Sequence, residues 1–376
     1  MFKCTGRMLY AAWLGAALLL LSCPFSAAAE VRPGVIVNGV KVRFPDIQPY
    51  VDANQKLMVP VRLISEQLGA KITWNDEGWA AFELGGKHIV IRLNESEALV
   101  DGQSVELDTK AVIQEGRMLV PLRFVSEALG VKVVWDHEAY TVKITDSEFE
   151  QSSPELDPWG RMIRQQSLPA NAADWPYVLA DIPNNAYSLG YRTRTSEAPD
   201  QQRLSSAITF NDPNLNREHL DQWANRIKRY YDLVFNVDYN EIEPEQWWKH
   251  FVPYMNETSV DSPARIQYAQ RVQEQRIRIE GWAEPEPSMT YRQDGNKYVM
   301  RTYVRFLILE SDAEYGVLLD AFQSSYEVKL KRGVWYSGYA DILLSTNTTG
   351  NPWPYYGVTG HDHLFFTPVA NIREEL

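Results

Sequence analysis

The sequence predicts an α+β protein in which two small antiparallel sheet-plus-helix repeats precede a domain of helices followed by an antiparallel sheet. Residues 56–62 (KLMVPVR) return 61 residues later as residues 117–123 (RMLVPLR), so one supersecondary unit is present twice. Apolar residues at three- and four-residue steps dominate residues 217–273, and strand-like alternation begins near residue 276. Helices followed by antiparallel strands are typical of an α+β domain.

Each repeat unit opens with a predicted β-hairpin. Residues 35–40 and 98–103 are apolar runs interrupted by Asn-Gly and Asp-Gly, which supply the positive φ that a tight turn needs. The following Leu-Met-Val-Pro or Met-Leu-Val-Pro run is short and β-prone. Because proline lacks a backbone donor, Pro60 and Pro121 suit the end of an edge strand that leads into a helix.

A short helix and another strand complete each unit. Apolar residues three and four apart give the helix one buried face, and Gly69 or Gly130 ends it in the left-handed conformation. Residues 71–74 and 132–135 then alternate polar and apolar and are expected as strands that end at tryptophan. Each copy is expected to bury a face that the other copy helps to cover.

The order of these motifs resembles the copper amine oxidase N-terminal-like stalk domain of secreted Gram-positive proteins. The resemblance covers residues 35–145 and rests on the Val-Asn-Gly turn, the Leu-Met-Val-Pro-Val-Arg run, a helix that ends in Leu-Gly and a strand that ends in tryptophan. It implies a small antiparallel sheet packed against a helix, which is an appendage in amine oxidases. Such an appendage holds neither the copper nor the quinone.

The chemistry of the amine oxidases themselves is not matched. Those enzymes resemble a β-sandwich with a quinone-forming tyrosine between Asn and Asp or Glu, a His-x-His pair and a third histidine. His361 and His363 have the His-x-His spacing, but no Asn-Tyr-Asp or Asn-Tyr-Glu occurs. Two imidazoles bind copper weakly unless a carboxylate such as Asp362 joins them. We therefore favour a polar turn at this point, expect no cofactor, and predict that the chain is not a competent copper amine oxidase.

The amino terminus has the pattern of a secretory signal peptide at residues 1–29. Two basic residues precede an apolar run at residues 8–21, and Ala-Ala-Ala at residues 27–29 supplies a cleavage site. Leu-Leu-Ser-Cys, which ends at Cys23, also resembles a lipobox, so lipid anchoring is the alternative. Pro24 directly after the cysteine favours simple secretion, and both alternatives place the protein outside the membrane or at the cell surface.

Composition excludes several partners. Removing Lys3 and Arg7 leaves 35 basic against 49 acidic residues, a net charge of −14, which repels nucleic acid and anionic lipid. The mature chain has no apolar run long enough for a membrane span. Both cysteines, Cys4 and Cys23, lie in the targeting segment, so no disulfide is expected after cleavage.

An acidic, polar linker at residues 146–158 separates the repeats from a different composition. Residues 159–376 hold eight of the twelve tryptophans and are expected to form an aromatic-rich α+β domain. Its opening is loop-rich, and a helix capped by Asn216 or Asn214 should then begin at residue 217. From about residue 214 the order of helices and sheet resembles nuclear transport factor 2-like domains, which implies a curved sheet around helices and a pocket.

Candidate binding residues in this domain are aromatic. The pair Trp247 and Trp248, together with Trp353, Tyr355 and Tyr356, could form a platform for sugar rings or peptide, although core packing explains most of such aromatics more simply. A catalytic pair of His219 with Asp221 is conceivable, but a lone helix histidine is usually a surface side chain.

Two function classes follow from the sequence. The first is a non-catalytic secreted cell-envelope protein, in which the stalk repeats present a binding domain for wall polymer, peptide or a protein partner. The second is an extracytoplasmic enzyme or small-ligand binder with a nuclear transport factor 2-like pocket, or a metal-dependent oxidase that uses His361 and His363. We predict the first, and expect the chain not to be an enzyme.

Overall fold

The computed structural model describes a chain that divides into two compact units, Met1–Glu30 and Val31–Leu376. The described residues all belong to the second unit and are 32–75, 78–190, 216–256, 263–294, 297–320, 328–345, 356–359, 364 and 370–375. The predicted signal peptide and the alternative lipid anchor at Cys23 lie outside them. None of the helices within this described part is long and apolar enough to span a membrane.

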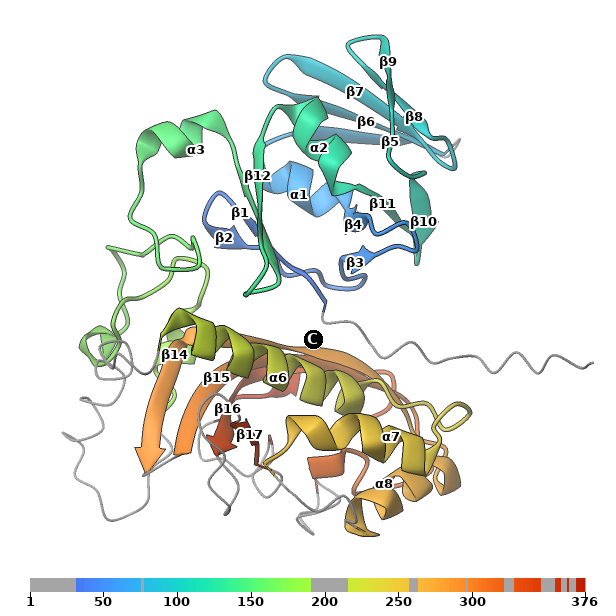
Figure 1. Ribbon diagram of the computed structural model, residues 1–376, viewed down its shortest axis with the longest axis vertical. Coiled ribbons are helices and arrows are strands. Elements are labelled where there is room, and N and C mark those ends of the chain that lie inside the picture. The colour runs from blue at the N-terminus through green and yellow to red at the C-terminus, as the bar shows by residue number, and fades with distance from the viewer. Residues whose placement is uncertain are drawn as a thin grey trace, which may run out of the picture. The chain divides into compact units, whose positions relative to one another are not determined.

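Both repeat units have the predicted order of hairpin, strand, helix and strand (Figure 1). The first comprises β1 (Gly34–Val37), β2 (Val40–Lys41), β3 (Tyr50–Val51), β4 (Leu57–Pro60), α1 (Val61–Gln67), β5 (Lys71–Asn75) and β6 (Trp79–Leu84). After β7 (Lys87–Arg92), the second comprises β8 (Glu97–Val100), β9 (Gln103–Glu106), β10 (Val112–Gln114), β11 (Arg117–Pro121), α2 (Leu122–Leu129), β12 (Lys132–Asp136) and β13 (Thr141–Thr145). We call residues 34–145 the stalk module.

A local two-fold symmetry relates the two units. Strands β4 and β11 pair antiparallel, and Val59 lies opposite Val120, its equivalent in the other copy. The symmetry extends to the ion pairs beside this sheet. Arg117 contacts Asp46 at 2.6 Å, and Lys56, the equivalent of Arg117, contacts Asp108 at 3.7 Å. The expectation that the copies share one buried core is confirmed, because α1, α2 and strands of both copies contribute to a single hydrophobic cluster.

Each opening hairpin completes the sheet of the other copy. The β1–β2 hairpin of the first copy joins β12 and β13 of the second, and the β8–β9 hairpin of the second copy joins β5 and β6 of the first through β7. The pairing of β1 with β13 is parallel, whereas all other strand pairs of the module are antiparallel. Strand β7 lies between β6 and β8 and pairs antiparallel with both.

The segment after the module contains a short helix, α3 (Ser147–Ser152), whose N-terminus is capped by the Asp146 side chain accepting from the Phe149 amide at 2.7 Å. Residues 159–190, which we call the arm, have little regular structure beyond η1 (Ala172–Asp174) and α4 (Asn184–Tyr187). Apolar side chains of the arm are nevertheless buried against the carboxy-terminal sheet. The expected loop-rich segment therefore packs as a layer on that sheet.

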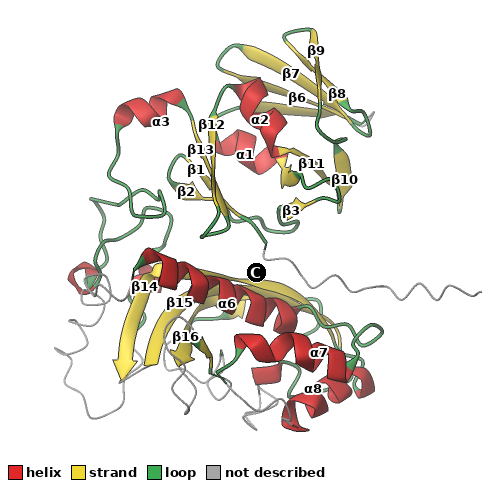
Figure 2. Cartoon of the chain, in the orientation of Figure 1, coloured by secondary structure: helices red, strands yellow, loops and turns green. Residues whose placement is uncertain are grey.

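The carboxy-terminal domain has helices first and an antiparallel sheet afterwards, as predicted. Figure 2 shows the helices α6 (Arg217–Phe235), α7 (Pro244–Phe251) and α8 (Pro263–Glu274). A short 3-10 helix, η2 (Val252–Tyr254), follows α7 in the sequence. The sheet comprises β14 (Arg278–Asp294), β15 (Lys297–Glu310), β16 (Trp335–Ser345), β17 (Gly357–Val358) and β18 (Arg373–Glu374). The predicted cap of α6 is confirmed, since the Asn216 side chain accepts from the His219 amide at 3.0 Å.

The two faces of this sheet have different coverings. Side chains alternate along a strand, so Val304 and Phe306 of β15 face the α6 side, where they join the main aromatic core. The neighbouring Val299 and Arg301 lie on the opposite face, against the arm. This second face also meets the stalk module, because the Arg305 guanidinium donates to the Pro45 carbonyl.

Candidate functional site

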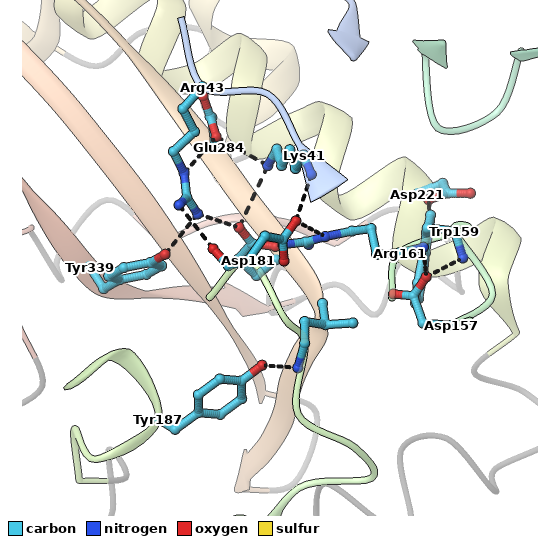
Figure 3. A network of polar contacts seen from close by, with 12 residues as sticks. Lys41, Arg43, Asp157, Trp159, Arg161, Asp181, Tyr187, Asp221, Glu284 and Tyr339 are labelled. Carbon is cyan, nitrogen blue, oxygen red and sulfur yellow. Dashed lines mark hydrogen bonds and ion pairs between the residues drawn. The ribbon is translucent and has the colours of Figure 1, made fainter. Parts of the chain in front are cut away.

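Six charged side chains, of which Arg161 and Glu286 are buried and the other four are half-buried, meet where the stalk module, the arm and the carboxy-terminal sheet come together. We call them the ionic cluster, and Figure 3 labels Lys41, Arg43, Arg161, Asp181 and Glu284, five of its six members, which point toward one another. Its cations are Lys41 on β2, Arg43 just after β2 and Arg161 of the arm; its anions are Asp181 of the arm and Glu284 and Glu286 of β14. Three positive and three negative charges therefore balance within one cluster.

Arg161 is the central cation. Its Nε and one terminal nitrogen donate to the two carboxylate oxygens of Asp181 at 2.9 and 2.7 Å, and its other terminal nitrogen donates to Glu286. A planar guanidinium suits this fork-like contact with carboxylates. Burial alone would lower the pKa of Arg161, but Glu286 and Asp181 hold that pKa well above its ordinary value.

Arg43 carries the contact from the stalk module. Its guanidinium donates to the Tyr339 hydroxyl at 2.7 Å and to Glu286 at 3.3 Å, and its Nε lies 3.4 Å from Glu284. The same group lies 4.9 Å from the ring centroid of Tyr303, within the range of a cation–π contact. One side chain of the module thus reaches three strands of the carboxy-terminal sheet, β14, β15 and β16.

Glu286 is the most deeply buried anion, with no exposed surface. Burial would raise the pKa of this carboxyl, but Arg161, Lys41 and Arg43 outweigh it and lower the pKa to about 2. Its place follows from the sequence Glu-Pro-Glu-Pro at residues 284–287, because alternate residues of a strand share a face. Strand β14 is at the edge of its sheet, where proline is tolerated.

A second group of polar contacts adjoins the cluster. The Asp157 carboxylate accepts from the backbone amides of Trp159 at 2.9 Å and Arg161 at 2.7 Å, and burial raises its pKa to about 6. The Trp159 indole donates to Asp221 of α6 at 2.6 Å, and Arg217 lies 3.3 Å from the same carboxylate. Asp221 is therefore bound to Trp159 and Arg217.

Arg301 fastens the arm to the sheet. It is fully buried and pairs with Asp341 at 2.7 Å, while its terminal nitrogens donate to the carbonyls of Ala186 at 2.7 Å and Gly190 at 2.8 Å. The Tyr291 hydroxyl donates to the same Asp341 at 2.5 Å. The backbone of the arm thus supplies acceptors that this arginine needs in the interior.

The aromatic residues predicted as a platform are distributed differently. Trp247, Trp248 and Tyr356 are 8, 2 and 1 % exposed and belong to the main core. Trp247 stacks on Phe251 with ring centroids 4.8 Å apart, and Tyr356 contacts Trp223 at 5.0 Å. These three aromatic side chains therefore pack in the core of the domain, which is the simpler of the two interpretations that the sequence allowed.

The remaining predicted site residues lie outside the described part of the chain. These are the aromatics Trp353 and Tyr355 and the predicted metal ligands His361 and His363. Within the part that is described, no cluster of three or more His, Cys, Asp or Glu side chains could hold a metal ion.

Sequence reasoning missed the ionic cluster because its members come from three distant segments. Each looks like an ordinary surface charge when read locally. A signal was present, however, since Lys41 and Arg43 share a spacing of two residues, as do Glu284 and Glu286. Paired like charges on one face of a strand need opposite charges nearby if that face is buried.

Comparison with known families bears on the stalk module alone. Residues 36–144 match the family model of the copper amine oxidase N-terminal domain. The match covers well under half of the chain, and it confirms the resemblance that the duplicated motif indicated. Searches against curated proteins and against solved structures each found no match.

Proposed function

We propose that this chain is a non-catalytic protein of the cell envelope, in which the stalk module and the carboxy-terminal domain form one rigid body that binds wall polymer, peptide or a protein partner. The observation that carries the proposal is the Arg43 contact with Glu286 and Tyr339. A side chain of the module that is bonded inside the neighbouring domain leaves little freedom for a hinge. The module therefore holds the domain in a fixed orientation.

Further contacts along the same boundary support rigidity. Arg217 of α6 pairs with Asp136 at the end of β12, and Asn225 donates to the Glu138 carbonyl at 3.0 Å. Arg32, just before β1, lies 3.8 Å from Asp232 of α6. Because these contacts are spread along α6, rotation of the module would have to break several of them together.

The chemistry of the ionic cluster also supports a holding role. Arg161 and Glu286 are buried and bonded to each other, and both are held in their charged forms. A general acid or base must exchange a proton near the working pH, and neither group is poised to do so. The predicted signal peptide supports an extracytoplasmic location.

Retention on purified cell-wall sacculi tests the binding role. The mature chain from Glu30 is incubated with sacculi and sedimented, and the pellet should retain it while an unrelated protein of similar acidity stays in solution. Recovery of all the protein in the supernatant, together with no capture of an envelope protein, would remove the support for an envelope binder.

A parallel assay addresses the oxidase alternative. The protein is loaded with copper and assayed for peroxide release from primary amines. We expect no release above that from free copper. Stoichiometric copper together with amine-dependent peroxide would replace this proposal with an enzyme that uses His361 and His363.

A further inference from the structure

A groove on the stalk module combines an exposed tryptophan with arginine side chains. It has a volume of about 190 Å³, and we call it the Trp74 groove. Most of its lining is apolar, and the lining includes Pro45, Asp46, Pro60, Arg62, Trp74 and Arg117. Trp74 lies on β5, at the edge of its five-stranded sheet. Its side chain is 38 % exposed, which is unusual for a large aromatic residue.

The internal duplication provides a comparison for this groove. Trp135 is the equivalent of Trp74 in the second copy and is 40 % exposed, but it packs edge-on against Tyr140 with ring centroids 5.0 Å apart. Trp74 has no such ring partner among the residues that the structure describes. The two indoles are similarly exposed but differ in their contacts, because Trp135 packs against a tyrosine ring whereas Trp74 lines the groove.

The arginines differ between the copies in the same way. Arg123 donates to Glu127 at 2.9 Å and lies 3.8 Å from Asp108. Its equivalent Arg62 forms no ion pair within the described ranges, although Glu66 stands where Glu127 stands in the other copy. Arg62 thus contributes an uncompensated positive charge to the groove.

The other charged residues of the groove leave its balance positive. Arg117 donates to Asp46 at 2.6 Å, so this pair is neutral overall and keeps lone pairs that hydroxyl groups can reach. Arg62 then sets the sign. In a chain with a net charge of −12, a locally positive groove is the place where an anionic ligand can approach without general repulsion.

We propose that the Trp74 groove binds an acidic sugar unit of an envelope polymer, with the sugar ring against the Trp74 indole and its carboxylate or phosphate on Arg62. An aromatic face packs against the apolar face of a sugar ring, and guanidinium groups match carboxylate and phosphate oxygens in geometry. This inference rests on the proposed envelope function and adds to it the chemical class of the ligand and the site that binds it. It places a binding surface on the stalk module itself.

Calorimetric titration of the mature chain tests the site directly. The probes are muramidase-released peptidoglycan fragments, which carry carboxylates, purified wall teichoic acid, which carries phosphates, and neutral chitohexaose. We expect one of the two acidic probes to bind and chitohexaose to bind at least about tenfold more weakly, because the charge-assisted hydrogen bonds to Arg62 are lost. The stronger acidic probe identifies the source of the anion.

Matched variants separate the groove from general effects. Trp74→Ala should weaken binding about fivefold or more and Arg62→Ala about tenfold. Trp135→Ala and Arg123→Ala remove the same residue types from the other copy and should leave the affinity unchanged. Circular dichroism verifies that each variant folds. If Trp74→Ala does not fold, Arg62→Lys takes its place in the test; it keeps the charge and should retain partial affinity.

Three results would overturn the inference. These are chitohexaose binding as tightly as the acidic probes, equal losses from the variants of both copies, and no binding of any probe. If sacculi retain the wild-type protein and the Trp74→Ala variant equally, the envelope function stands and the groove is not its site. If sacculi retain neither, the envelope function itself has failed.

Discussion

Removing the charge of Glu286 is the most informative perturbation of the ionic cluster. Glu286→Gln keeps the size of the side chain and one acceptor oxygen but leaves Lys41, Arg43 and Arg161 with only two carboxylates. Because Glu286 has no exposed surface and Arg161 is buried, water has little access to the Arg161 guanidinium that loses its partner. The variant should therefore fold with a much smaller free energy of unfolding.

The magnitude follows from two independent considerations. Breaking one partner of a buried ion pair costs about 3 to 5 kcal/mol. The cluster lowers the pKa of Glu286 from 4.5 to about 2, and this difference corresponds to about 3 kcal/mol of preferential stabilisation of the charged form. A loss of about 3 kcal/mol is a large fraction of the stability of a typical domain.

Urea denaturation followed by tryptophan fluorescence measures this loss. Glu127→Gln is a matched control, because Glu127 is an exposed partner of Arg123 and should contribute less than about 1 kcal/mol. The difference between wild type and Glu286→Gln should persist above pH 4.5 and shrink as the pH falls toward 2, since the folded-state pKa is depressed. A loss below 1 kcal/mol at pH 7, or a difference that does not depend on pH, would refute the reasoning.

Three further predictions concern the arm and the sheet. Burial raises the pKa of Asp157 from 3.8 to about 6, so the free energy of unfolding falls by about 3 kcal/mol as the pH rises through that window. In urea titrations, Asp157→Asn should therefore be more stable than wild type at pH 7.5 and equally stable at pH 3.5. Arg301→Met leaves Asp341 buried without a cation and should cost about 3 to 5 kcal/mol of the free energy of unfolding. Limited proteolysis should then cut the arm, and an arm that stays intact would contradict the role of Arg301 in holding it. Gly281→Ala places a Cβ 2.6 Å from the Arg305 carbonyl oxygen and should destabilise β14 by about 1 to 3 kcal/mol in the same denaturation assay, a result that an unchanged midpoint would contradict.

The local structure of the stalk module could be predicted because its patterns are short-range. The Asn-Gly turn, the apolar spacing of α1 and the Gly130 ending are each decided within a few residues, and Gly130 has the expected positive φ of 70°. The exchange of hairpins between the copies could not be predicted. It depends on the pairing of β1 with β13, which are more than a hundred residues apart, and no local pattern encodes that choice.

The candidate site was harder to predict for a related reason. Aromatic content alone does not distinguish a core from a binding surface, and Trp247 lies four residues before Phe251 on one helix face, a spacing typical of core packing. The ionic cluster requires knowledge of which strand faces which segment.

The distance between the stalk module and the carboxy-terminal domain in solution tests the central claim most directly. Spin labels at Gln103→Cys on β9 and Gln246→Cys on α7, in the chain that begins at Glu30 and lacks both native cysteines, report it by pulsed electron spin resonance. A rigid body predicts one narrow distance distribution that broadens in Arg43→Met. A broad distribution in the wild-type protein, unchanged by that substitution, would contradict the account.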